Sequence, residues 1–175
     1  MALFLLLLAY LLGSIPFGYL IGRQRGLDIR RYGSGNIGAT NVFRTLGLGS
    51  GLLVFILDLL KGSVAVWLMI GLNNNPWLVI LAGGLAILGH TFSVFLKFKG
   101  GRGAATGLGI LLAVAPEIFF FTIIIVAIII AVTRYVSAGS ILGAVIVALA
   151  FSLTGRPLPY TILAREVLEK AVRTD

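Results

Sequence analysis

The residues best suited to hold a ligand form a polar, glycine-rich stretch, GSGNIGATNVFR, within an otherwise apolar chain. Glycines let backbone N–H groups approach an anion, and an arginine guanidinium can hold a phosphate through two parallel hydrogen bonds. The small polar side chains between them add neutral hydrogen-bonding groups. The stretch therefore predicts an anion site, most simply a phosphate site. Its candidate binding residues are Ser34, Gly35, Asn36, Gly38, Thr40, Asn41 and Arg44.

Two other interpretations of this stretch are open. Gly33 to Gly38 matches the dinucleotide pattern G-x-G-x-x-G, but that pattern requires a preceding β-strand in a βαβ unit. Here an apolar segment and a basic linker precede it. The other interpretation is a flexible loop whose arginines only fix membrane orientation. It suits the arginines from Arg23 to Arg31, but it does not explain the polar residues that lead to Arg44.

A second candidate site lies in the stretch GHTFSVFLKFKGGRGAATGLG. His90, the one histidine of the chain, lies inside an apolar segment, about two helical turns before Lys97. An ionisable residue within a membrane span is a functional hypothesis by default. No second histidine, cysteine or carboxylate is spaced to form a metal site with it. The binding candidates that follow are Lys97, Lys99, Gly100, Gly101 and Arg102, although the lysines could instead only reach the membrane interface.

Polar residues also interrupt other apolar segments. Ser137 and Ser140 follow Arg134 in a third basic stretch, RYVSAGS, whose alternative is an ordinary span boundary with an interfacial tyrosine. Asp58 and Lys61 lie three residues apart, where they can pair on one helix face. A neutralised pair facing the bundle interior is the simplest interpretation of the two, and direct catalysis is the alternative.

The elements that must position these residues are membrane helices. Apolar residues make up 59% of the chain, and several runs approach the roughly 20 residues needed to cross a bilayer. The strands of a β-barrel would alternate apolar and polar residues, which these runs do not. We expect an all-α polytopic helical membrane bundle of about six membrane segments. Their expected ranges are 3–22, 50–71, 77–96, 104–115, 117–133 and 138–154, the fourth being short enough to be re-entrant.

Basic residues in alternate connections predict the orientation of the bundle. They follow the first, third and fifth segments, whereas residues 71–76 and 115–116 carry none. By the positive-inside rule, the N-terminus faces outside and the three basic stretches lie together at the cytoplasmic face. Residues 1–155 should form a single integral membrane domain. Residues 156–175 should form a short amphipathic tail, with Glu166 and Lys170 paired on one helix face.

Composition also excludes several kinds of chemistry. The absence of cysteine removes thiol and disulfide chemistry, and no acidic cluster is present that could hold Mg²⁺. We therefore expect neither a metal nor a cofactor, and we attribute the net charge of +8 to membrane orientation rather than to nucleic-acid binding. An enzyme with such a site would act by positioning and charge stabilisation on a substrate that is already activated.

Several motifs together resemble a known family. YLLGSIPFGYLIG, GSGNIGATNVFRTLG, LDLLKG, GHTFSVFLKFKGGRGAATGLG and RYVSAGS occur in the order found in bacterial acyl-phosphate:glycerol-3-phosphate acyltransferases, over about residues 9–155. The resemblance implies a multi-pass enzyme of the bacterial cytoplasmic (inner) membrane whose active site faces the cytoplasm. Its reaction would move a fatty acyl group from acyl-phosphate to the 1-hydroxyl of glycerol 3-phosphate, giving lysophosphatidic acid, the first acylation step of phospholipid synthesis.

The resemblance also implies partners and roles. The partners would be membrane lipid, the enzyme that produces acyl-phosphate and the next acyltransferase. A substrate phosphate would accept the proton that the hydroxyl loses. The implied role of Arg44, Lys99 and Arg102 is to bind phosphate. Ser34, Asn36 and Asn41 would orient the glycerol hydroxyl or the acyl carbonyl. His90 and Ser137 would polarise the carbonyl side.

The chain departs from the family pattern at several positions. Arg102 stands where lysine is more usual, and Ala138-Gly139 replaces a more usual Leu-Ser type of pair. Family members continue into a seventh span that ends in a segment His-Arg-x-Asn-Ile-x-Arg-Leu, which residues 161–175 do not resemble. Two alternatives to the acyltransferase therefore stay open. One is a small anion (phosphate) transporter or channel that uses the same basic loops, and the other is a non-catalytic remnant.

Overall fold

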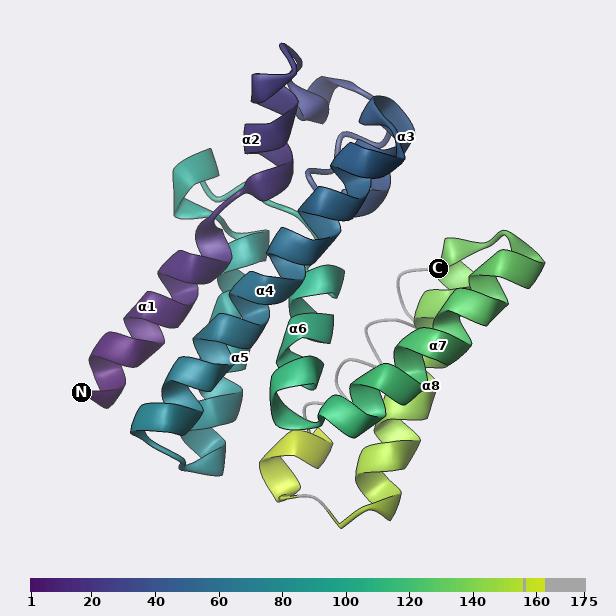
Figure 1. The fold of residues 1–175 in the computed structure, drawn as a ribbon. Helices are drawn as coiled ribbons and strands as arrows, with labels where there is room; N and C mark the ends of the chain where they lie inside the picture. Colours follow the sequence, from purple (N-terminus) through teal and green to yellow (C-terminus); the bar gives the residue numbers. More distant parts are fainter. Residues whose placement is uncertain (156, 163–175) are drawn as a thin grey trace. The chain divides into compact units, whose positions relative to one another are not determined.

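The computed structural model describes residues 1–155 and 157–162, without the side chains of Val136, Ser137 and Ser140. The described residues form helices and connecting loops and no strand, which confirms the predicted all-α membrane fold (Figure 1). The chain divides into two compact units, Met1–Val114 and Ala115–Asp175, which are described separately. The expectation that residues 1–155 form one domain stays a prediction. The expected tail helix lies outside the described residues.

The first unit contains α1 to α6, and its helices agree closely with the expected segments. The bounds are α1 (Ala2–Ser14), α2 (Phe17–Gln24), η1 (Ile29–Arg31), α3 (Ala39–Leu46), α4 (Leu48–Leu72), α5 (Pro76–Thr91), η2 (Val94–Leu96) and α6 (Ala104–Val114). Three segments here are long and apolar enough to cross a membrane, namely Ala2–Gln24, Leu48–Leu72 and Pro76–Leu96. α6 is a shorter apolar helix, as the sequence predicted.

The first predicted span is broken in its middle. Pro16 has no N–H to donate and forces the residue before it out of the helical conformation, so Ile15 adopts φ −59° and ψ 116°. Carbonyls freed by such a break must find donors inside the protein when they lie at membrane depth. The Ser93 hydroxyl donates to the Ser14 carbonyl at 2.6 Å, and Lys61 Nζ donates to the Ile15 carbonyl at 2.9 Å.

Glycines bring the helices of the first unit into close contact. α4 packs against α1, α5 and α6 (Figure 1). A Cβ at Gly89 of α5 would collide with the Tyr10 carbonyl of α1, and one at Gly109 of α6 would collide with the Leu59 carbonyl of α4. The Ser63 hydroxyl uses the second approach to donate to the Gly109 carbonyl at 2.8 Å. Small residues at such crossings let backbones approach, which drives helix association in membranes.

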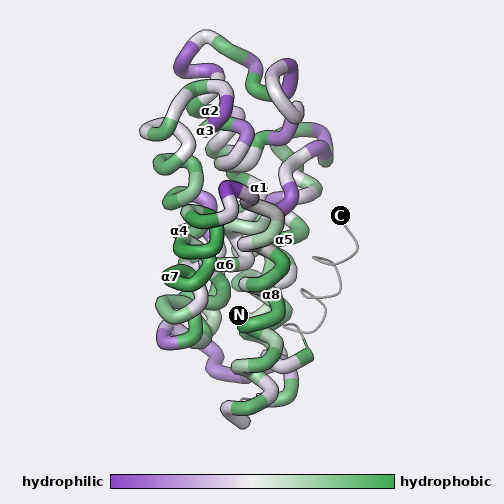
Figure 2. The backbone as a smooth tube through the Cα atoms, turned by 90° about the vertical axis from the view of Figure 1, so that its right-hand side faces the viewer, coloured by the Kyte–Doolittle hydropathy of each residue, from purple (hydrophilic) through white to green (hydrophobic). Residues whose placement is uncertain are grey.

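The polar loops rest on an apolar cluster of their own. Figure 2 shows hydrophilic backbone in the connections around α2 and α3, and mainly hydrophobic backbone along α4, α5 and α6. Ile29 and Ile37 of these connections are buried together with residues of α2, α3, α4 and η2. The cluster consists of Ile21, Ile29, Ile37, Val42, Val54 and Leu96. Because Leu96 comes from the second candidate stretch, this cluster joins the two polar stretches to one support.

The second unit contains α7 (Pro116–Thr133) and α8 (Val136–Leu153), which pack against each other. α7 is long and apolar enough to span a membrane, and residues Ile141–Leu153 of α8 form a shorter apolar helix. α8 presents glycines to α7, because a Cβ at Gly139 would lie 2.7 Å from a side-chain carbon of Ile130. The number of spans and the side on which the N-terminus lies stay predictions.

We predict that Gly89→Ala destabilises the protein whereas Gly84→Ala does not. The added methyl at position 89 would collide with the α1 backbone, while the one at position 84 would have no atom within 4 Å. Overpacking costs about 1–3 kcal/mol, and alanine at the open position should be neutral or slightly stabilising. Unfolding in detergent, followed by the fluorescence of Trp67 and Trp77, measures the difference. Equal destabilisation by the two substitutions would contradict the role given to this close approach.

Candidate active site

The first polar loop is held in one conformation by a buried asparagine. Asn41 is 3% exposed, and its Oδ1 accepts from the backbone N–H of Ser34 at 2.9 Å. Its Nδ2 donates to the carbonyls of Ile29, Tyr32 and Asn36 at 3.3, 3.0 and 2.8 Å. Since both ends of the amide are used by the loop backbone, the structure favours a positioning role for Asn41 over the direct role expected from the sequence.

Asn36 forms a tight turn within the same loop. Its Oδ1 accepts from the backbone N–H of Gly38 at 2.9 Å, the usual self-bonding turn of an asparagine. The oxygen is therefore used within the loop. Gly38 is the residue before α3, so the turn also fixes where that helix begins. Ser34 and Thr40, on either side, are exposed.

The second polar loop is constrained by backbone hydrogen bonds. Gly100 N donates to the Thr91 carbonyl at 2.9 Å and Gly101 N donates to the His90 carbonyl at 3.0 Å, so the loop folds back onto the end of α5. Lys97 and Phe98 both adopt positive φ, 55° and 61°. Such conformations are uncommon for residues other than glycine and persist only where the surroundings impose them. Backbone strain of this kind is often found at ligand sites.

The two loops meet at His90. A Cβ at Gly101 would collide with His90 Nε2 and would lie 3.2 Å from Asn36 Oδ1. The histidine ring thus lies under the glycine turn, with the Asn36 side chain beside it. The structure therefore confirms that residues of the first and second candidate stretches are neighbours, and we call this place the loop junction, formed by Asn36, His90, Gly100 and Gly101.

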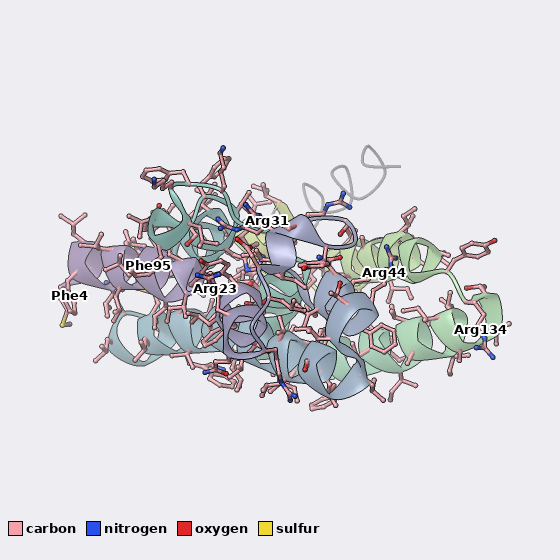
Figure 3. The ribbon with its side chains drawn as sticks, turned by 90° about the horizontal axis from the view of Figure 1, so that it is seen from above. Phe4, Arg23, Arg31, Arg44, Phe95 and Arg134 are labelled. Carbon is pink, nitrogen blue, oxygen red and sulfur yellow. The ribbon has the colours of Figure 1, made fainter. Side chains whose placement is uncertain are left out.

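Exposed cations lie on the loops around this junction. Figure 3 looks down on the end of the first unit that carries α2 and α3, with Arg23, Arg31 and Arg44 labelled. Arg44 is an exposed residue of α3, while Lys97, Lys99 and Arg102 are exposed on the second loop. Positive side chains in this number favour a negatively charged ligand.

One arginine of the first loop is already paired. Arg30 donates to both oxygens of Asp28, at 2.9 and 2.8 Å, and lies over the Tyr19 ring. The hydrogen bonds from Arg30 lower the pKa of Asp28 from 3.8 to about 2. Because this pKa is lower in the folded state than in the unfolded chain, the ionised carboxylate stabilises the folded state at pH values above the ordinary carboxyl pKa. This stabilisation is lost as the pH falls toward 2. Arg30 is therefore held within the loop by its own ion pair. This is compatible with the interpretation in which it contributes to membrane orientation and binds no ligand.

Beneath the junction lies a buried ionic trio that the sequence revealed only in part. The expected pair is present, with Lys61 Nζ 2.8 Å from Asp58 Oδ1. The sequence did not indicate that His90 belongs to this group, and its Nδ1 lies 3.6 Å from the same Asp58 oxygen. The sequence could have indicated this contact, because ionisable residues in membrane spans usually pair with one another. Only the packing of α4 against α5 shows which atoms approach.

The candidates of the second unit are not tested by the structure. Ser137 and Ser140 belong to α8 and Arg134 precedes it, but the described residues fix neither serine side chain, and each unit is described by itself. Their participation stays a prediction. The same holds for the direct ligand contacts expected of Ser34, Gly35, Thr40 and Arg44.

Fold and site together define a multi-pass helical membrane protein with an anion-attracting loop junction at one end of its first unit. A family model described as "Glycerol-3-phosphate acyltransferase" matches residues 3–169. The chain belongs to this family. The finding confirms the resemblance inferred from the motifs.

Relatives with the same description are similar over most of their length. A glycerol-3-phosphate acyltransferase of Thermus thermophilus is 48% identical over 157 residues, covering 90% of this chain and 79% of that protein. Glycerol-3-phosphate acyltransferase 2 of Moorella thermoacetica is 48% identical over 163 residues, with coverages of 93% and 84%.

Solved structures show the same fold. The glycerol 3-phosphate form of PlsY (YgiH), described as an integral membrane glycerol 3-phosphate acyltransferase, superposes with a TM-score of 0.90 at 40% identity, covering 99% of this chain and 88% of that one. Its lysophosphatidic acid form gives a TM-score of 0.89 at 39% identity. The two forms carry a glycerol phosphate and its acylated product on a fold like this one.

We predict that Asn41→Ala loosens the first loop without unfolding the helices. The substitution leaves the Ser34 N–H and three carbonyls without their partner, and an unpaired buried polar group costs about 1–3 kcal/mol. Hydrogen exchange of the amides of residues 29–38 should accelerate roughly 10- to 100-fold, corresponding to a loss of about that size. Asn75→Ala, which removes only the cap that accepts from Trp77 N at 3.0 Å, is the matched control. Unchanged protection of residues 29–38 in Asn41→Ala would refute the positioning role.

Proposed function

We propose that this protein transfers a fatty acyl group from acyl-phosphate to the 1-hydroxyl of glycerol 3-phosphate, producing lysophosphatidic acid and inorganic phosphate. Family membership and the similarity to the two ligand-bound acyltransferase structures support the acceptor and the product. The observation that carries the proposal in this chain is the loop junction, where polar groups of two glycine-rich stretches meet and whose neighbouring residues include exposed cations. Acyl-phosphate as donor is supported by the motif resemblance.

The composition of the junction fits a reaction that needs little acid–base chemistry from the protein. The hydroxyl oxygen attacks the acyl carbonyl carbon, the bond from that carbon to the phosphate oxygen breaks, and the hydroxyl proton goes to the released phosphate. Both substrates carry phosphate, and positive side chains stabilise the charge that grows on the leaving group. Holding hydroxyl and carbonyl in reacting geometry supplies much of the remaining rate.

The residues divide into groups by the chemistry they can offer. Cations bind the phosphates, and the neutral polar groups orient the reacting oxygen atoms. In the proposal the phosphates are bound by the side chains of Arg44, Lys97, Lys99 and Arg102, and the hydroxyl or carbonyl by Ser34, Asn36, Thr40, His90, Ser137 and Ser140. The N–H groups of Gly35, Gly38, Gly100 and Gly101 donate within the protein, so these glycines shape the loops that carry the binding groups. Asn41 supports this set by holding the first loop.

The proposal places the protein in the bacterial cytoplasmic membrane with the junction facing the cytoplasm. The basic loops support this orientation through the positive-inside rule. Apolar helices below the junction would accommodate the acyl chain among membrane lipid. The proposed partners are the enzyme that supplies acyl-phosphate and the acyltransferase that uses the product.

We predict that the purified protein in lipid makes lysophosphatidic acid from acyl-phosphate and glycerol 3-phosphate, and that Arg44→Ala lowers kcat/KM roughly 10- to 100-fold. The expected size corresponds to losing one charge-assisted hydrogen bond of about 1.5–3 kcal/mol. Arg25→Ala, which removes an exposed arginine just after α2, should retain full activity. Product formation measured by mass spectrometry distinguishes the variants.

Several outcomes of the same assay would reject the proposal. Folded protein that gives no product refutes the transferase function, and phosphate flux into liposomes would then favour the transport alternative. Product from acyl-CoA but not from acyl-phosphate refutes the donor. An equal loss in Arg25→Ala and Arg44→Ala would show that Arg44 contributes only general positive charge.

A further inference from the structure

The buried trio of Asp58, Lys61 and His90 links distant parts of the first unit. The three residues are 1%, 4% and 4% exposed. Lys61 Nζ bridges Asp58 Oδ1, at 2.8 Å, and the carbonyl of Ile15 at the break in the first span, at 2.9 Å. His90 Nδ1 lies 3.6 Å from the same Asp58 oxygen and has no other polar partner among the described residues.

Asp58 and Lys61 already neutralise each other, so the nearby histidine needs its own explanation. Lys61 already neutralises Asp58 and satisfies the freed carbonyl of Ile15. Buried ion pairs contribute little net stability, because desolvation offsets their attraction. A neutral His90 leaves the trio without net charge, which is the least costly arrangement in a membrane interior. A third ionisable residue at this depth is therefore better explained by its effect on the loop junction than by packing.

The carboxylate selects which ring nitrogen of His90 carries the proton. A carboxylate only accepts hydrogen bonds, so the nitrogen that faces it must be the donor of a neutral ring. Nδ1 faces Asp58, so Nε2 is left without a proton and becomes an acceptor. The same logic fixes the tautomer of histidines that act beside carboxylates in other sites. The separation of 3.6 Å can shorten when a ligand binds, as hydrogen bonds of ligand-free sites commonly do.

Nε2 lies at the loop junction, directly beneath Gly101 and beside Asn36. The Asn36 atom on this side is Oδ1, which would lie 3.2 Å from a Cβ at Gly101 and which also accepts from Gly38 N. With Nε2 unprotonated, the side-chain atoms at the junction are both acceptors. An alcohol hydroxyl can donate a hydrogen bond to such an acceptor, whereas an acyl carbonyl can only accept.

We propose that Asp58 and Lys61 are positioning residues that hold neutral His90 with Nδ1–H toward Asp58, so that Nε2 accepts a hydrogen bond from the acceptor hydroxyl. The inference rests on the proposed function for the identity of that hydroxyl, the 1-hydroxyl of glycerol 3-phosphate. It assigns His90 to the alcohol side of the reaction, in contrast to the carbonyl side expected from the motif resemblance. Binding through Nε2 orients the hydroxyl for attack, and the proton still leaves to the released phosphate.

The tautomer can be measured directly because the chain contains one histidine. Nitrogen-15 NMR of histidine-labelled protein in lipid, at neutral pH, should show a single neutral ring with Nδ1 protonated and Nε2 unprotonated. Protonation at Nε2, or a doubly protonated ring, would overturn the proposal. This measurement needs neither a variant nor activity, so it is decided independently of the proposed function.

The contribution of the pair is tested by removing both charges at once. In Asp58→Leu/Lys61→Met, which leaves no unpaired buried charge, the fixed tautomer should be replaced by a mixture. Ser63→Ala is the matched control, because it removes a buried hydrogen bond of the same helix to Gly109 and not to His90. A wild-type tautomer ratio in the double variant, or an equal change in Ser63→Ala, would overturn the role of the pair.

Hydroxyl binding is tested with a ligand pair that differs only in its alcohol groups. Glycerol 3-phosphate should shift the Nε2 signal of the wild-type protein, and n-propyl phosphate should not. Equal shifts with both ligands would overturn the assignment to the hydroxyl. If the enzyme is active, the double variant should lose roughly 10- to 100-fold in kcat with KM for glycerol 3-phosphate within about threefold, because orientation and not phosphate binding is lost. A loss confined to KM would count against the proposal, whereas absence of product in every variant would count only against the proposed function.

Discussion

A helix broken within an apolar candidate span must satisfy its freed carbonyls within the protein, and this requirement organises the first unit. Pro16 ends α1, and Ser93 and Lys61 donate to the carbonyls of Ser14 and Ile15. Lys61 in turn requires a counter-ion, which Asp58 provides. Asp58 faces His90, whose ring lies under the glycine turn of the second loop. The break in the first span is thus connected, through a few contacts, to the place where the polar loops meet.

Close backbone packing makes these contacts possible. α5 approaches α1 at Gly89, and α6 approaches α4 at Gly109, so polar groups on one helix reach carbonyls on another. The loops are constrained in the same manner, the first by the Asn41 amide and the second by its hydrogen bonds to the end of α5. Rigid loops keep their donors in place before a ligand arrives, and such preorganisation is what makes electrostatic stabilisation effective. The exposed cations then act from a fixed support.

Much of the fold followed from periodicity and charge alone. The long apolar runs predicted helices close to those observed, from α4 at Leu48–Leu72 to α7 at Pro116–Thr133, because a lipid-facing helix must be apolar along its length. The sequence predicted one unbroken segment over residues 3–22 and not the break at Ile15. The apolar run continues through Pro16, and hydropathy does not reflect the N–H group that proline lacks. Candidate site residues were recognisable because burying a polar or charged group in a membrane costs free energy, so such groups are rare there without a structural or functional role.

The sequence by itself therefore determined the class of fold, the family and the two polar stretches of the candidate site, since all of these depend on residue type and order. Only the tertiary structure decided which of those residues hold the loop and which face the junction. Asn41 and Asn36 look alike in the sequence, yet one is buried with its amide used by four backbone groups and the other lies beside His90. The approach of His90 to Asp58 likewise depends on how α5 packs against α4, because a contact between residues 32 positions apart depends on helix rotation and depth, which residue order alone does not specify.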